Sequence, residues 1–218
     1  MKKGDCVKIN YVGRIKDTGE IFDLTYEDIA KKEGIYNPKI KYQPVGIILG
    51  SGMILKGLEN KIFEMNIGEK RKIELSAKEA FGEREPKLVK VVPISEIKKS
   101  GIDPRPGLIV DFSGIKGRIQ SVSSGRVRID FNNPLAGKDI EYEVELVEKI
   151  DDLKEKIKNV LEFFGVYKYD PDIEIDVEKN EIRYKKEIPE KIKKLIWKIF
   201  NESLDMNDLK FVQIFKKE

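Results

Sequence analysis

The chain has 218 residues, with 42 basic and 39 acidic side chains and a formal net charge of only +3, a balance that does not require a nucleic-acid partner. Histidine is absent and Cys6 is the single cysteine, which excludes imidazole-based triads, histidine metal sites, internal disulfides and thiolate clusters. No run approaches the roughly 18 apolar residues of a membrane-spanning helix, so we expect a cytoplasmic protein.

The first 82 residues predict a strand-rich half domain. Apolar and polar residues alternate over residues 7–15, as in a half-buried strand, and a turn at 17–20 leads into a second extended segment at 21–23. Residues 25–28 match a capping box that opens a short helix ending at Gly34. Residues 56–65 have helical spacing with Gly68 as a stop signal, and residues 70–77 alternate again.

A further alternating segment at residues 141–148 follows only after a long gap, so the body carries an insertion. Within the gap, proline and glycine bound short alternating segments such as residues 107–112 and 126–131, a pattern that predicts a small β-domain. Residues 83–133 hold ten basic and six acidic side chains, so the insertion has a net charge of +4.

The segment after residue 150 predicts an α-β-β-α-β unit. Its first helix spans residues 153–164 with Asp151 and Asp152 at its start, where acidic pairs usually act as caps. Strands at 172–179 and 181–186, a helix opened by Pro189 and a strand at 209–215 complete the unit. A unit of this size can barely bury its own core, so association with a second copy is expected to help it.

Five motifs in a fixed order carry a resemblance to a known family. They are Tyr11-Val12-Gly13, Phe22-Asp23, the segment 50–59, Ala80-Phe81-Gly82 and the segment 142–146. In this order they resemble the FKBP-type peptidyl-prolyl cis-trans isomerases. The resemblance covers residues 1–82 and 133–150 and implies an α+β fold in which an antiparallel half-barrel wraps one helix.

The place of the insertion narrows the resemblance to the SlyD-like, long archaeal type, whose insert-in-flap domain acts as a chaperone. The implied domains are therefore residues 1–82 with 133–150 for isomerisation, 83–132 for the flap insert, and 151–218 for a C-terminal α/β domain that is a possible homodimerisation unit. The implied partners are unfolded or partly folded proteins with X-Pro bonds. The histidine- and cysteine-rich metal-binding tail of bacterial SlyD proteins is lacking here, so we expect neither a metal nor a cofactor.

The resemblance also implies the site residues. The catalytic set is Tyr11, Phe22, Asp23, Leu55, Leu58, Phe81 and Tyr142, and the substrate-binding set is Val45, Ile54, Leu88, Val89, Val91 and Ile94. Asp23 would supply the polar edge of an apolar pocket, and the backbone N–H of Leu55 would hold a substrate carbonyl. Phe81 stands where most members have tyrosine, and the missing hydroxyl removes a hydrogen bond worth about 0.5–1.5 kcal/mol.

Three other interpretations stay open at the level of sequence. The pocket residues are also plausible as core residues of a β-barrel. Because Phe81 lacks the hydroxyl of the usual tyrosine, the sequence is also compatible with a chaperone scaffold that has little isomerase activity. Residues 107–131 contain glycines, basic residues and the aromatic residues Phe112 and Phe131, which allows a small RNA-binding β-barrel, although its charge is mild and its stacking residues are few.

Overall fold

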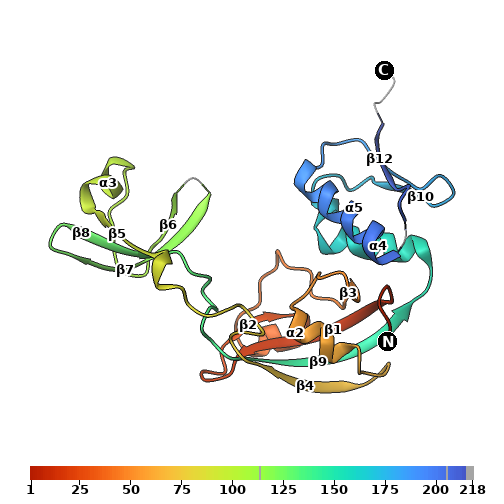
Figure 1. Cartoon of the computed structure of the whole chain (residues 1–218), viewed down its shortest axis with the longest axis horizontal. Helices are drawn as coiled ribbons and strands as arrows, with labels where there is room; N and C mark the ends of the chain where they lie inside the picture. Colours follow the sequence, from red (N-terminus) through yellow and green to blue (C-terminus); the bar gives the residue numbers. More distant parts are fainter. Residues whose placement is uncertain (113, 205, 215–218) are drawn as a thin grey trace. The chain divides into compact units, whose positions relative to one another are not determined.

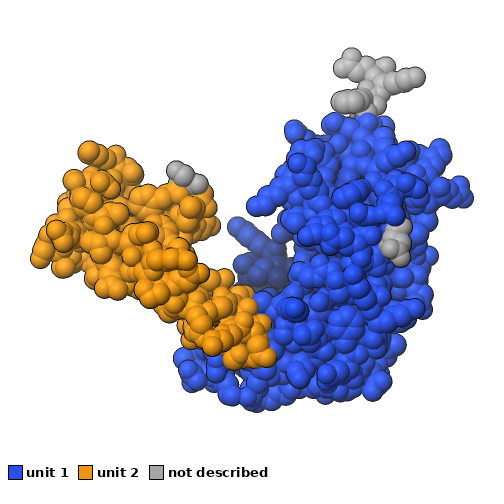
Figure 2. All heavy atoms as spheres, in the orientation of Figure 1, with its two compact units in different colours: residues 1–75, 139–218 blue, residues 76–138 orange. Residues whose placement is uncertain are grey.

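The computed structural model describes residues 1–112, 114–204 and 206–214. The chain divides into two compact units, which are coloured separately in Figure 2. Unit 1 comprises Met1–Leu75 and Asp139–Glu218, and unit 2 comprises Ser76–Lys138. Unit 2 contains the expected insert and extends several residues beyond it on each side. The C-terminal segment, expected as a separate domain, lies in the same compact unit as the strand-rich body.

Unit 1 is built on a five-stranded antiparallel sheet (Figure 1). Its strand order is β2-β1-β9-β4, and β3 also pairs with β1. The strands are β1 (Cys6–Ile15), β2 (Ile21–Leu24), β3 (Val45–Ile48), β4 (Lys70–Leu75) and β9 (Ile140–Ile150). The helix α2 (Lys56–Ile62) packs against β4. The strands and the helix expected from alternation and helical spacing are therefore confirmed, whereas β3 was not expected.

The short helix near residue 30 forms, but its predicted cap is wrong. Helix α1 spans Glu27–Lys32 and starts after Tyr26, without a side-chain cap. The Thr25 hydroxyl instead accepts a hydrogen bond from the backbone N–H of Tyr11 and donates to Asn10 Oδ1, each at 2.9 Å. The buried Thr25 hydroxyl is already hydrogen-bonded to β1, so it does not cap the helix. Thr25 thus ties the segment after β2 to β1.

The C-terminal segment follows the predicted α-β-β-α-β order. Helix α4 (Leu153–Phe163) begins at Asp152, whose Oδ1 accepts the backbone N–H of Glu155 at 2.8 Å, so the predicted cap is confirmed. A 3-10 turn (Val166–Lys168), β10 (Glu174–Asp176), β11 (Glu181–Tyr184), α5 (Glu190–Leu204) and β12 (Lys210–Gln213) follow. The predicted last strand ran to Phe215, which lies outside the described residues.

This segment shares a hydrophobic core with the sheet of unit 1. The cluster that holds Phe200, Val160 and Leu161 also contains Cys6 and Ile150 from the sheet. Helix α4 packs on β3, where a Cβ at Gly46 would collide with the Asn159 side chain. The glycine therefore permits the close approach of helix and strand.

Unit 2 contains a four-stranded antiparallel sheet and one α-helix (Figure 1). A 3-10 turn (Pro86–Leu88) precedes β5 (Val89–Pro93), α3 (Ile94–Lys99), β6 (Ile109–Phe112), β7 (Ile115–Ser123) and β8 (Arg126–Asp130). The strand order is β5-β8-β7-β6. One side of this sheet carries the core formed by Ile97, Val110, Ile119, Val127 and Ile129. The expected β-rich domain is thus present, with α3 as an addition that the sequence did not reveal.

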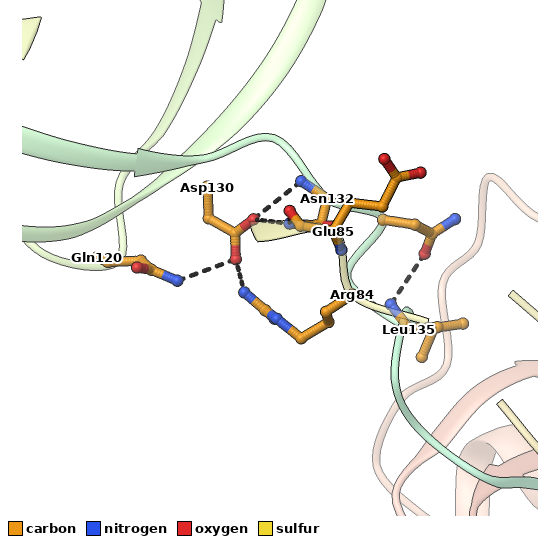
Figure 3. Close-up of polar contacts among 7 residues, drawn as sticks. Arg84, Glu85, Gln120, Asp130, Asn132 and Leu135 are labelled. Atoms are coloured by element: carbon orange, nitrogen blue, oxygen red, sulfur yellow. Dashed lines mark hydrogen bonds and ion pairs between the residues drawn. The ribbon is translucent and has the colours of Figure 1, made fainter. Parts of the chain in front are cut away.

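The buried Asp130 carboxylate, at the end of β8, connects several segments at one end of the sheet in unit 2. Asp130 Oδ2 accepts hydrogen bonds from Arg84 and from Gln120 Nε2, the latter at 3.0 Å. Asp130 Oδ1 accepts from the backbone N–H and the side-chain amide of Asn132, and the Asn132 amide also binds Glu85 (Figure 3). The chain entering the sheet and the chain leaving it are therefore fastened to the same group.

Candidate functional site

Three aromatic rings meet at one end of β1. The rings of Tyr11 and Tyr142 are 5.8 Å apart at an interplanar angle of 75°, and those of Phe22 and Tyr142 are 5.6 Å apart at 85°. Both are edge-to-face contacts, each worth about 0.5–1.5 kcal/mol beyond the area that it buries. We call this arrangement of Tyr11, Phe22 and Tyr142 the aromatic cup.

The cup forms because of a glycine and an irregularity in strand pairing. Gly13 pairs with Tyr142 on one side and with Asp23 on the other. A Cβ at Gly13 would lie 2.7 Å from the Phe22 ring and 2.8 Å from the Tyr142 ring, so only glycine lets both rings approach. The register between β1 and β2 shifts at this point, which leaves Phe22 as an extra residue. Such bulges turn a side chain in a new direction.

Asp23 gives the cup a polar edge. The Tyr11 hydroxyl donates a hydrogen bond to Asp23 Oδ2 at 2.9 Å. Asp23 is exposed along one side, yet loss of hydration at its carboxyl raises its pKa, and the hydrogen bonds from Tyr11 and from the backbone of Leu24 oppose this rise. The carboxyl is therefore held in one orientation beside the rings.

The two tyrosines of the cup are poor acids. Burial is the main reason why the pKa values of Tyr11 and Tyr142 are raised, and the nearby Asp23 carboxyl raises both further. Each hydroxyl consequently keeps its proton at neutral pH and acts as a hydrogen-bonding group. The cup thus contains no group suited to carry a proton to and from a substrate near neutral pH.

The other predicted residues of unit 1 lie on neighbouring elements. Leu55 is the residue before α2, and its backbone N–H has no hydrogen-bond acceptor within the described part of the chain. Leu58 is buried on α2, Ile54 is half-buried just before it, and Val45 pairs with Ile9 on β3. The role of the Leu55 N–H as a donor to a substrate carbonyl stays a prediction.

The remaining predicted residues belong to unit 2. Phe81, Leu88, Val89 and Ile94 are half-buried, whereas Val91 has 57% of its surface exposed. Ile94 packs against the core of the unit. The participation of these residues in the site stays a prediction.

A cavity of about 570 Å³ in unit 1 adjoins the predicted site, and sequence reasoning missed it. Tyr11 and Val45 lie on its wall together with residues 39–41 and 43–44 and with Asn159, Phe163 and Tyr167 of the C-terminal segment. Its volume falls within the roughly 300–1,000 Å³ of typical ligand sites. No signal in the sequence linked the C-terminal segment to Tyr11, because that link depends on the packing of α4 on β3.

Among the described residues, no group of three or more His, Cys, Asp or Glu side chains is placed so that it could hold a metal ion. Likewise, none of the described helices is both long enough and apolar enough to cross a membrane.

Comparisons with known proteins point to one family. Residues 90–135 match the family described as FKBP26, IF domain. A short-type peptidyl-prolyl cis-trans isomerase of Methanocaldococcus jannaschii is 31% identical over 146 residues, which cover 67% of this chain and 92% of that protein. A probable FKBP-type 16 kDa isomerase of Pseudomonas fluorescens is 32% identical, covering 48% of this chain and 72% of the relative.

A third relative is named SlyD, the type of FKBP that the place of the insertion suggested. The FKBP-type isomerase SlyD of Helicobacter pylori is 30% identical over 113 residues, covering 50% of this chain and 60% of that protein. The family predicted from the five motifs is therefore confirmed: the chain belongs to the FKBP-type peptidyl-prolyl cis-trans isomerases.

Proposed function

We propose that this chain is a peptidyl-prolyl cis-trans isomerase and folding chaperone, in which unit 1 rotates X-Pro bonds and the flap insert captures unfolded chains. The observation that carries the proposal is the aromatic cup around Gly13 with Asp23 at its edge. The relatives named as isomerases support the same activity.

Rotation about an X-Pro bond needs no proton transfer. The barrier of about 20 kcal/mol arises from the partial double bond of the planar amide. An apolar surface that excludes water favours the twisted form, because the planar form has the greater charge separation and loses more hydration. A chain without histidine, whose cup tyrosines keep their protons, has the means for this chemistry.

Each group has a defined role in this proposal. The rings of the cup hold the proline ring, with Leu58, Ile54 and Val45 extending the apolar wall. The free N–H of Leu55 binds a substrate carbonyl and fixes the strand on one side of the rotating bond. Asp23, oriented by the hydrogen bond from Tyr11, supplies the polar edge of the cup beside the rotating bond. Phe81 keeps the catalytic role that the resemblance implied for it.

The domain division expected from the sequence also belongs to the proposal. Residues 83–132 form the chaperone insert, and the match over residues 90–135 supports this assignment. Exposed aliphatic side chains suit the capture of unfolded chains, and the described residues of unit 2 include Val91, Leu108, Ile109 and Ile115 as exposed aliphatic side chains. Because the insert and the isomerase body belong to one chain, capture by the insert raises the effective concentration of X-Pro bonds for the body.

The C-terminal segment is proposed to associate with a second copy. On α5, Ile196, Ile199 and Phe200 are buried in the shared core, whereas Leu195 and Trp197 keep 42% and 44% of their surface exposed. Sedimentation of the parent and of Trp197→Glu tests this role, because the charge should shift a dimer toward monomer. We place the protein in the cytoplasm, where a free cysteine such as Cys6 stays reduced.

A refolding assay with Asp23→Ala tests the proposed function. The parent should accelerate both a short X-Pro peptide and a protein whose refolding is limited by proline isomerisation. The variant should lose several-fold in rate on both substrates, while its binding to a permanently unfolded chain stays unchanged. A parent that binds unfolded chains but accelerates neither substrate would be a chaperone scaffold, and the isomerase proposal would be wrong.

A further inference from the structure

The sheet of unit 2 has an outer side that its core does not cover. Val127 and Ile129 of β8 point into the core, so Arg126 and Arg128, which alternate with them, point to the outer side. On β7 the corresponding outer positions are Lys116 and Arg118, opposite Asp111 and Asp130 in the register. All four cationic residues are exposed. We call Lys116, Arg118, Arg126 and Arg128 the basic face.

The cations of the basic face have no internal counter-ions. No ion pair or side-chain hydrogen bond joins these four residues to any residue that the structure describes. Asp130 is the natural partner of Arg118, but Arg84, Gln120 and Asn132 already occupy both of its oxygens (Figure 3). Asp111, opposite Lys116, accepts the backbone N–H of Gly114 at 2.7 Å. The positive charge is consequently available to a partner.

Exposed aliphatic side chains stand next to these cations. Val91 on β5 pairs with Arg128 and has 57% of its surface exposed, and Ile109 on β6 pairs with Arg118 and has 59% exposed. Strands β5 and β6 are the two edges of the sheet, where unpaired backbone groups can bind an added strand. Side-chain contacts on this side would then select the sequence of that strand.

Nucleic acid fits the basic face less well than a polypeptide does. Binding of single strands needs aromatic platforms on which bases stack. The nearby aromatic residues are Phe112 of β6 and Phe131, which follows β8; their rings lie 5.9 Å apart in edge-to-face contact and pack against the core. They point away from the cations, so the face combines charge with aliphatic groups instead of aromatic ones.

We propose that the basic face selects extended segments of unfolded protein in which acidic residues stand beside apolar ones. The acidic groups pair with the arginines, and the apolar groups cover Val91 and Ile109. This inference rests on the proposed capture of unfolded chains and adds the chemistry of the segments that are captured. It also predicts that capture weakens as salt rises, because exposed ion pairs are screened.

Two fluorescent peptides without proline test the inference with the full chain. Both carry the same apolar residues, and the residues between them are glutamate in one peptide and lysine in the other. We expect the acidic peptide to bind about tenfold more tightly at low salt, as several exposed ion pairs together allow. At high salt the preference should shrink.

Charge reversal on the two sides of the sheet provides the matched control. Arg126→Glu with Arg128→Glu should abolish or reverse the preference for the acidic peptide. Lys98→Glu with Lys99→Glu makes the same change in charge on α3, whose Ile97 packs into the core on the other side, and should leave the preference intact. Arg126→Gln with Arg128→Gln repeats the first test with a smaller change in charge.

The outcomes separate the inference from the proposed function. Equal affinity for both peptides, or equal effects of the two charge reversals, would overturn the selection of acidic segments and leave capture itself standing. Binding of neither peptide would overturn capture and the inference together. Tighter binding of a single-stranded RNA homopolymer than of the acidic peptide would assign the face to nucleic acid and overturn the inference alone.

Discussion

Gly13→Ala places one methyl group where the cup forms. In the parent, a Cβ at this position would lie 2.7 and 2.9 Å from two atoms of the Phe22 ring and 2.8 Å from the Tyr142 ring. Carbon atoms in ordinary contact are about 3.5–4.0 Å apart. The backbone of Gly13 lies within paired strands on both sides, so the rings must retreat by more than about half an ångström.

The displacement of the rings should lower both the stability and the catalytic rate. Overpacking of a well-filled site costs about 1–3 kcal/mol of stability, so the protein should remain folded. A displacement of about 1 Å in a catalytic arrangement can reduce the rate about a hundredfold. We therefore expect kcat/KM for a short X-Pro peptide to fall about tenfold or more, a larger effect than the loss of stability alone would give.

Peptide isomerisation and denaturant unfolding measure the two effects separately. Gly117→Ala is the matched control, because a Cβ there would lie 2.6 Å from Ile129 and 2.7 Å from Phe131 in unit 2. It should destabilise that unit to a similar degree and leave the peptide rate unchanged. Full kcat/KM in folded Gly13→Ala would refute the role of the cup.

Three further changes test contacts elsewhere in the two units. The Asp170 carboxyl is buried, which alone would raise its pKa, but backbone N–H groups of Lys186, Lys185 and Asp172 lower it below 3.8. The stability that this carboxylate contributes is therefore complete above pH 3.8 and lost as the pH falls through the lower folded value. Asp170→Asn should unfold at lower temperature at pH 7 and show a weaker acid dependence in thermal scans. Gly46→Ala should cost about 1–3 kcal/mol in denaturant unfolding, because its methyl group displaces α4 from β3; an unchanged midpoint would contradict that packing. Asp130→Ala should speed hydrogen exchange in residues 84–132 by freeing Arg84, with the peptide rate unaffected.

The alternation of apolar and polar residues and their helical spacing were sufficient to predict most strands and helices. The alternation of residues 7–15 and 141–148 appears as β1 and β9, and the helical stripe that stops at Gly165 appears as α4. Gly165 has φ +64°, the left-handed conformation typical of a helix end. Strand β3 was missed because it is short and contains Gly46. Such a strand gains its stability from pairing with β1 instead of from its own pattern.

Tertiary contacts account for what the sequence did not reveal in the site. The motifs identified Tyr11, Phe22, Asp23 and Tyr142, but the requirement for glycine at position 13 depends on two rings that come from other strands. Asn159 is typical of a solvent-facing helical position, yet it is buried against β3. The cavity beside Tyr11 depends on that packing, so no local sequence pattern could predict it.

The most direct test of the central claim compares isomerisation in water and in heavy water. An aromatic cup that eases rotation by excluding water transfers no proton, whereas general acid or base catalysis does. With a short X-Pro peptide, we predict equal kcat/KM in the two solvents and a flat profile between pH 6 and 8, since the chain has no histidine and burial raises the pKa of Cys6 to about 11. A rate that falls about twofold or more in heavy water, or a bell-shaped pH profile, would contradict the account.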